Sequence, residues 1–293
     1  MSQMWRSSLP YFSVIVPFRN EEECVDRAIN SLKRQSFFNF EAILIDDRSE
    51  DNSVPVARQS IGNDPRFRVV TAPKRSIGAA RNHGIRLAQG IRLMFLDADD
   101  HLRPNTLLIL FLASIIFRPN VLMFSARARF EGMPTQKRAL EKRNLILRRH
   151  RMAFINKAGP DALVRLENSG AYLHFATLLS IETSFLRKSN LFFTEGVFHE
   201  DVVFTFRLIT QSELVTLIPA RLYTRTIRPD SVTGAAGRKN IADLSTAMVD
   251  LEKRMEAIPA GSDSHRSALR ILAEVHEYQS RIRRKICRTE SLE

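Results

Sequence analysis

The first hundred residues alternate short, mostly apolar runs with segments whose apolar residues recur at helical spacing. The apolar runs are Phe12–Phe18, Phe40–Ile45, Arg66–Val70 and Ile91–Leu96. Continuous apolar, β-branched runs are typical of strands whose two faces are both buried in a parallel sheet. Because strands and helices alternate, the sequence predicts an α/β fold with a mostly parallel central sheet and helices on both faces.

Helix signals separate these strands and continue beyond them. Asn20, followed by Glu23 three residues later, has the spacing of a capping box and predicts a helix that begins there. Ser76–Gly90 predicts another helix, and so does the apolar spacing after Asp201. Leu222–Gly234 has turn residues at its end and is predicted to be a loop or a short strand.

The longest apolar run, Thr106–Phe117, has 12 residues. A bilayer span needs about 20 residues, so a buried helix is predicted instead. No secretory signal is recognisable, and Cys24 and Cys287 lie far apart with no CxxC pair. This small number of widely spaced cysteines argues against a disulfide framework or a structural zinc site and suits a reducing cytosol. We therefore expect a cytoplasmic protein, either soluble or peripheral on the inner face of the membrane.

Polar residues follow four successive predicted strands at the point where each strand ends. The segments are Pro17–Asn20, Asp46–Asp47, Lys74–Arg75 and Asp97–Asp100. Ligands of open α/β sheets bind beyond the carboxyl ends of the strands, so these segments predict one binding edge. Asp97 and Asp99 would face the same side if extended backbone persists there. Paired carboxylates suit Mg²⁺ or Mn²⁺ held together with substrate phosphates, and a solvated acidic turn is the alternative.

Basic residues are in excess, with 44 Lys and Arg against 32 acids and a net charge of +12. Such an excess predicts attraction to polyanions. Arg127–Lys157 alone holds ten basic residues and two acids. We interpret this segment either as a solvated loop or as a surface that contacts anionic lipid headgroups. From Ile241 the composition predicts helices, and the amphipathic stretch Ser267–Ile286 is a second candidate for a membrane contact.

Several well-known enzyme motifs are absent from the sequence. It contains no GxxxxGK[ST] phosphate loop, no GxGxxG at the first helix and no GxSxG. A P-loop NTPase, a dinucleotide-binding enzyme and an α/β-hydrolase are therefore disfavoured.

Six stretches resemble the inverting nucleotide-sugar glycosyltransferases of family 2, which have the GT-A fold. They are Val14–Glu22, Ile45–Ser53, Ser76–Ile85, Phe95–Pro104, Phe198–Phe204 and Ile227–Gly234. The resemblance implies a GT-A catalytic domain over residues 11–235, followed by a helical C-terminal extension over residues 240–293. It also implies a nucleotide-sugar donor, a saccharide or lipid-linked acceptor, and a role in making cell-surface polysaccharide or glycolipid.

The resemblance assigns roles on the nucleotide side of the site. Pro17 and Arg19 match the loop that wraps the nucleotide. Asp47 matches the acid that reads the base edge, which makes UDP the expected nucleotide. Arg81 matches an arginine near the diphosphate.

The remaining acids are assigned to the metal and to catalysis. Asp97 would face the ribose or the metal, and Asp99 would ligate the Mg²⁺ or Mn²⁺ that bridges the diphosphate. Asp201 matches the catalytic base, which takes the proton of the acceptor hydroxyl. Glu200 is expected to position the acceptor, and His199 either to contact the diphosphate or to pack. A capping cluster without a catalytic role is the alternative for all three.

The chain departs from the family near its last motif. Family members often carry Tyr-Arg-x-Arg before this turn, whereas here Thr226 stands where the first arginine would be. Arg228 matches the second arginine and, with Ser231, is expected to bind the diphosphate. Arg225 is the candidate to replace the missing arginine.

Two other functions stay open at this point. A nucleotidyltransferase that makes nucleotide sugars would be expected to carry a Gly-rich loop after its first strand, which this chain lacks. A nucleic-acid-binding protein without transferase activity would interleave basic and aromatic residues. Arg127–Lys157 shows no such alternation, so no nucleic acid partner is expected.

Overall fold

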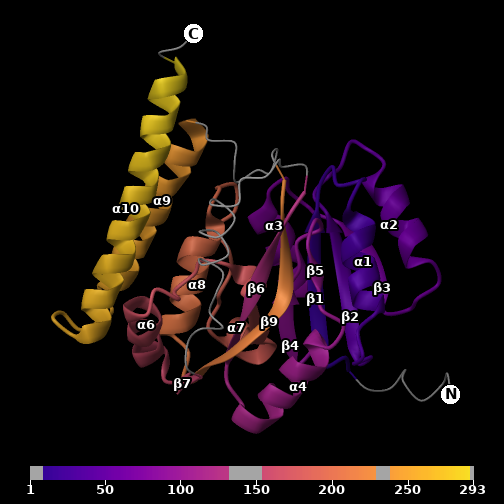
Figure 1. The fold of residues 1–293 in the computed structure, drawn as a ribbon, viewed down its shortest axis with the longest axis horizontal. Helices are drawn as coiled ribbons and strands as arrows, with labels where there is room; N and C mark the ends of the chain where they lie inside the picture. Colours follow the sequence, from indigo (N-terminus) through magenta and orange to yellow (C-terminus); the bar gives the residue numbers. More distant parts are fainter. Residues whose placement is uncertain (1–8, 132–153, 229–237, 291–293) are drawn as a thin grey trace.

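The computed structural model describes residues 9–131, 154–228 and 238–290 (Figure 1). Across these residues a nine-stranded sheet forms in the order β3-β2-β1-β4-β8-β6-β9-β5, with β7 also paired to β9. The strands are β1 (Phe12–Phe18), β2 (Phe40–Asp46), β3 (Phe67–Thr71), β4 (Arg92–Phe95), β5 (His101–Leu102), β6 (Val121–Phe130), β7 (Ile155–Lys157), β8 (Leu179–Glu182) and β9 (Val215–Ile227).

Six of these strands, β1, β2, β3, β4, β6 and β9, run in one direction, while β5, β7 and β8 run against their neighbours. The four runs predicted from the sequence form the parallel half, β3-β2-β1-β4. The mostly parallel sheet is therefore confirmed. Because parallel strands share a direction, their carboxyl ends meet at one edge, which fixes where the polar loops gather.

Helices cover both faces of the sheet, as predicted. They are α1 (Val25–Lys33), α2 (Ser53–Ile61), α3 (Ile77–Leu87), α4 (Thr106–Phe117), α6 (Gly159–Asn168), α7 (Thr183–Lys188), α8 (Glu200–Thr210), α9 (Arg238–Met255) and α10 (Asp263–Glu290). Side chains of α1, α2 and α4 share a core with Val14 and Val16 of β1. Ile15 faces the other core, which contains α3, α6, α7, α8, α9 and α10. β1 thus contributes to two cores because its side chains alternate between the faces.

The predicted helix start at Asn20 is wrong. The first helix begins at Val25 with Cys24 at its N-cap, so Cys24 precedes the helix. Asn20 has a left-handed backbone, with φ of 52°, and its side chain accepts from the backbone N–H of Glu50 at 2.9 Å. The side chain that resembled a helix cap instead ties the loop after β1 to the loop after β2.

Leu222–Gly234 was predicted as a loop or a short strand, and its first part belongs to the long strand β9. β9 pairs with β6 on one side and with β5 and β7 on the other. Residues 229–237 lie outside the described residues. The turn residues therefore mark where the strand ends, and the strand is fixed by pairing partners distant in sequence.

α4 is a helix, as predicted, but it is buried on one face alone. Leu107 and Leu110 are fully buried, whereas Leu112, Ile115 and Ile116 are 50–68% exposed. Within the described residues, no helix has both the length and the apolar character that crossing a membrane requires.

The C-terminal helices α9 and α10 pack side by side, and they contact α8 and α6, respectively (Figure 1). Ile271, Val275 and Ile282 of α10 are buried in the core shared with α8. The apolar face that suggested a membrane contact is therefore occupied by packing within the protein. The division into domains at residues 235 and 240 stays a prediction.

Candidate active site

The ends of β1 and β2 lie where the nucleotide is expected. Pro17 is buried within β1, whereas Arg19, just beyond the strand, is exposed. Asp47 donates its backbone N–H to the carbonyl of Phe18 at 2.8 Å. Its carboxylate accepts from the N–H of Ser76, the N-cap of α3, at 3.0 Å. Burial raises the pKa of Asp47, and the Ser76 bond and the charge of Arg19 oppose this shift. The expected nucleotide residues thus lie on two adjacent strands.

Two carboxylates of the acidic loop after β4 form ion pairs with two different arginines. Ala98 and Asp99 form a turn, so the extended backbone that would place Asp97 and Asp99 on one side does not persist. Asp97 pairs with Arg81 at 3.1 Å, and Asp99 pairs with Arg228 at 3.2 Å. Burial, followed by the charge of Asp97, raises the pKa of Asp99 to about 6. The two acids are therefore electrostatically coupled although each contacts a different arginine.

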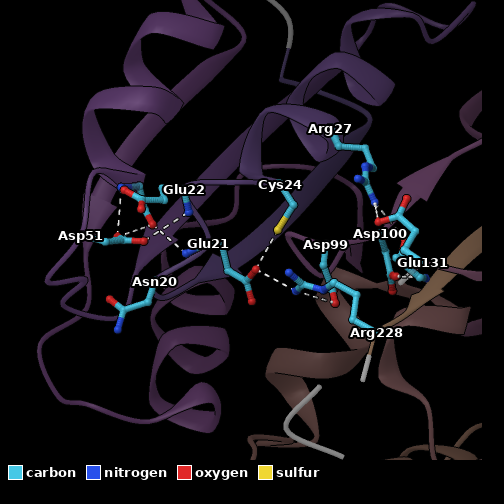
Figure 2. A network of polar contacts seen from close by, with 12 residues as sticks. Asn20, Glu21, Glu22, Cys24, Arg27, Asp51, Asp99, Asp100, Glu131 and Arg228 are labelled. Carbon is cyan, nitrogen blue, oxygen red and sulfur yellow. Dashed lines mark hydrogen bonds and ion pairs between the residues drawn. The ribbon is translucent and has the colours of Figure 1, made fainter. Parts of the chain in front are cut away.

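Arg228 is shared between two loops (Figure 2). Its guanidinium donates to Glu21 at 2.9 Å as well as to Asp99. Glu21 also accepts from the thiol of Cys24 at 2.7 Å, and burial raises the pKa of that thiol. Sequence reasoning missed Glu21 because nothing in the run Glu21–Glu23 distinguishes one acid from the next. Contact with Arg228 joins the loop after β1 to the end of β9.

Asp100, the last acid of the same loop, is buried and has a structural role. It accepts from the hydroxyl of Tyr223 and from the backbone N–H of Thr226, both at 2.6 Å. The hydroxyl of Tyr223 in turn accepts from the backbone N–H of Asp97 at 3.2 Å. These bonds hold the β4 loop against β9. No sequence signal separates this anchoring acid from its neighbours Asp97 and Asp99.

The start of α8 carries the three residues expected to act in catalysis. Glu200 is buried and forms an ion pair with Arg81. Asp201 is partly exposed, and its pKa is raised to about 8 by lost hydration and by the charge of Glu200, against the opposing effect of Arg81. Arg81 therefore contacts both Asp97 on the loop after β4 and Glu200 at the start of α8. The structure brings these two parts of the predicted site into one cluster.

His199 precedes the helix with a left-handed backbone, at φ of 63°. Its ring lies edge-on to that of Tyr278 on α10, with centroids 5.6 Å apart. Burial lowers its pKa, which favours the neutral imidazole. The contact with Tyr278 is the packing alternative expected for this histidine.

The structure shows the surroundings of Thr226, which stands where family members often carry an arginine. Thr226 is buried, and its hydroxyl accepts from Arg27 at 3.4 Å. Arg228 reaches Asp99, whereas the guanidinium of Arg225 lies 4.6 Å from the ring centre of Phe175. Neighbouring residues on a strand point to opposite faces of the sheet. Arg225 therefore points away from the face of Thr226, where the family's first arginine would lie. Ser231 lies outside the described residues.

The donor atoms present fit a divalent metal that is completed by substrate. Among the described residues, no three His, Cys, Asp or Glu side chains are grouped to hold an ion. Asp97 and Asp99 provide two carboxylates, and Mg²⁺ is commonly held by one or two carboxylates plus substrate phosphates. The pair therefore suits an ion that arrives with a diphosphate.

The chain belongs to glycosyl transferase family 2, because residues 13–166 match the model of that family. This confirms the family expected from the six motifs. The chain is 25% identical over 229 residues to EpsJ of Bacillus subtilis, an uncharacterized glycosyltransferase. The match covers 77% of this chain and 63% of EpsJ. A chondroitin synthase of Pasteurella multocida is 31% identical over 97 residues, which cover 33% of this chain and 10% of that protein. The chain thus spans less than two thirds of the curated relatives it matches.

Solved structures share the fold. Staphylococcus aureus TarS in complex with UDP-GlcNAc superimposes with a TM-score of 0.69 at 20% identity, covering 90% of this chain and 71% of that one. A mannosyltransferase of Pyrobaculum calidifontis, in complex with GDP-Man and Mn²⁺, gives a TM-score of 0.62 at 15% identity over 98% and 81% of the two chains. These similarities confirm the GT-A type of fold.

Replacing Arg81 should destabilise the protein by leaving two acids without their cation. We expect Arg81→Met to lower the free energy of unfolding by about 3–5 kcal/mol, because Glu200 would remain buried and unpaired. The double variant Arg81→Met/Glu200→Gln should recover part of that loss. Urea unfolding measures both, with Arg86→Met, half-exposed on the same helix, as the control. An Arg81→Met protein within about 1 kcal/mol of wild type would contradict this role.

Proposed function

We propose that the chain is an inverting glycosyltransferase that moves a sugar from a UDP-sugar to a hydroxyl of a saccharide or lipid-linked acceptor. The observation that carries the proposal is the bridge by Arg81 between Asp97 and Glu200. Arg81 thereby joins two parts of the site. One is the acidic loop of Asp97 and Asp99, which suits a divalent metal bound to a diphosphate, and the other is the helix α8, which carries Asp201 with its raised pKa. The UDP and UDP-GlcNAc complexes of TarS support UDP as the nucleotide. The match to a chondroitin synthase, an enzyme that makes a polysaccharide, supports a role in cell-surface polysaccharide or glycolipid synthesis.

On the donor side, Pro17, Arg19 and Asp47 would bind the nucleoside, with the buried carboxylate of Asp47 accepting from a base N–H. Asp97 and Asp99 would hold Mg²⁺ or Mn²⁺. When bound, such an ion neutralises charge on the departing diphosphate. Arg228, now paired with Asp99 and Glu21, would contribute positive charge beside the diphosphate, and the neutral hydroxyl of Ser231 would donate a hydrogen bond to it.

On the acceptor side, Asp201 would take the proton of the attacking hydroxyl. The acceptor oxygen bonds to the anomeric carbon from the face opposite the diphosphate, and the bond to the diphosphate oxygen breaks. The bonding electron pair leaves with the nucleoside diphosphate, so the anomeric configuration inverts. Glu200 would orient the start of α8 through Arg81, and neutral His199 would hold the adjoining loop.

The two other functions considered from the sequence gain no support. The family match and the curated relatives are to glycosyltransferases, and none of these comparisons points to nucleotide-sugar synthesis or nucleic-acid binding.

Substituting the two key acids should separate donor binding from chemistry. Asp99→Asn should lose the thermal stabilisation that UDP with Mn²⁺ confers, and transfer with it, because a metal ligand is removed. Asp201→Asn should keep that stabilisation while transfer falls by about 10²-fold or more, because the base is removed. Asp26→Asn, an exposed acid on α1, is the control. Turnover like wild type in either variant would remove that residue from the mechanism.

The raised pKa of Asp201 predicts a pH-dependent stability of the metal-free protein. Between pH 4 and about 8 the unfolded chain has released this proton and the folded protein has kept it. The free energy of unfolding of wild type should therefore fall with rising pH relative to Asp201→Asn, by at most about 1.4 kcal/mol per pH unit. Thermal unfolding of both proteins from pH 5 to 9 measures this. Parallel curves would show that the pKa is not raised.

Membrane contact is proposed from charge alone. In Arg127–Lys157, Arg129 pairs with Glu131 at 3.2 Å, and residues 132–153 lie outside the described part. On α10 the apolar face is packed inside the protein, so Arg283 and Arg284, both exposed, are the groups left for headgroups.

This contact should depend on anionic lipid. Wild type should float with phosphatidylglycerol-containing vesicles and not with phosphatidylcholine vesicles. Replacing Arg148, Arg149 and Arg151 by Gln should reduce recovery, whereas Arg34→Gln, exposed after α1, should not. Equal recovery with the two lipids would refute an electrostatic contact.

A further inference from the structure

The start of the catalytic helix α8 is in contact with the C-terminal helix α10. Tyr278 of α10 lies edge-on to His199, with an interplanar angle of 85°, and its side chain is 37% exposed. One residue further on, Gln279 donates to the carbonyl of Ile241 at 2.9 Å and to the hydroxyl of Ser245 at 2.6 Å. These bonds fix α10 on α9, so the position of the Tyr278 ring is set by the fold.

α9 is in turn tied to the loop that leads into α8. The carboxylate of Asp243 accepts from the backbone N–H of Phe198 at 2.9 Å. The catalytic loop, α9 and α10 therefore form one connected unit. Tyr278 is thus held against His199, two residues before Asp201, by its contact with that ring and by the bonds of Gln279.

Two charged groups, Arg225 and Asp201, interact electrostatically with Tyr278. The guanidinium of Arg225 lies against Phe175, on the side of β9 away from the Arg228 cluster. The charge of Arg225 acts to lower the pKa of Asp201, against the larger effects that raise it. On the pKa of Tyr278, Arg225 has a lowering effect and Asp201 a raising effect. The three side chains are therefore within electrostatic reach of one another.

This combination of groups suits a sugar ring. A pyranose has an apolar C–H face that packs on an aromatic ring, and hydroxyls that both donate and accept hydrogen bonds. Tyr278 offers the ring, Arg225 offers N–H donors alone, and Asp201 accepts. An acyl chain has no polar group that could pair with Arg225 or Asp201.

We propose that Tyr278 and Arg225 form the acceptor subsite, which binds the terminal sugar of a saccharide with its reacting hydroxyl at Asp201. This rests on the proposed transferase function and names the acceptor class as a saccharide. The helix α10 lies outside the segment that matches the family model, so this subsite belongs to the chain's own C-terminal part.

The test compares Tyr278→Ala and Tyr278→Phe with Leu269→Ala, which alters an exposed apolar residue of the same helix. The acceptor probes are p-nitrophenyl glycosides of hexoses and N-acetylhexosamines, used with a panel of UDP-sugars and Mn²⁺. Their binding is measured by saturation-transfer NMR in the presence of UDP, and their transfer by steady-state kinetics. Stabilisation by UDP with Mn²⁺ reports the donor site independently.

We expect Tyr278→Ala to raise the KM for the glycoside, or to weaken its NMR signal, by about tenfold or more. The KM for the UDP-sugar and the stabilisation by UDP should not change. Tyr278→Phe keeps the ring and should stay within about threefold of wild type, and Leu269→Ala should match wild type.

Two results would overturn the inference. In one, Tyr278→Ala binds and uses the glycosides as wild type does. In the other, wild type that is stabilised by UDP binds none of the glycosides. Failure of the proposed function would look different, because wild type would then neither be stabilised by UDP nor transfer from any UDP-sugar.

Discussion

A single buried guanidinium holds the candidate site together. Arg81 projects from α3 and contacts Asp97 on the β4 loop, 16 residues further on, and Glu200 at the start of α8, which is 119 residues away. Burying a guanidinium costs several kcal/mol unless carboxylates compensate it. The two acids must therefore be in place for the arginine to be buried, and the arginine must be present for the acids to lie so close. The fold and the site are consequently stabilised by the same ion pairs.

A second set of bonds fixes the other side of the same loop. Asp100 is buried between Tyr223 and Thr226 of β9, and Arg228 at the end of that strand returns to Asp99 and Glu21. The acidic loop is therefore held from both sides, by Arg81 on one and by β9 with Arg228 on the other. Such preorganisation means that the charges around a diphosphate do not have to be ordered during the reaction.

The parallel half of the sheet could be predicted because each strand carries its own signal. β1 reads as a buried strand from its seven apolar or small residues, and its position at the centre follows from burial on both faces. The helix cap at Asn20 was predicted wrongly because its side chain bonds to Glu50, thirty residues away. The role of Asp100 could not be predicted, since the difference between an anchoring acid and a metal ligand lies in β9, which approaches through pairing with distant strands. Asp97 and Asp99 were predicted from the end of their strand as well as from family motifs, and Asp201 from a family motif, whereas Tyr278 lies in a helix without one.

The order of the chain separates two tasks. Most residues expected to bind the donor lie before residue 103, with Arg228 and Ser231 as the exceptions, whereas α8, β9 and α10 lie after residue 199. The family model ends at residue 166, before the second group begins. Changes in the later helices could thus alter which molecule is glycosylated while the nucleotide end stays intact. If the proposed roles hold, a new acceptor specificity would require changes in α8 and α10 that keep Arg81 and Arg228 in place.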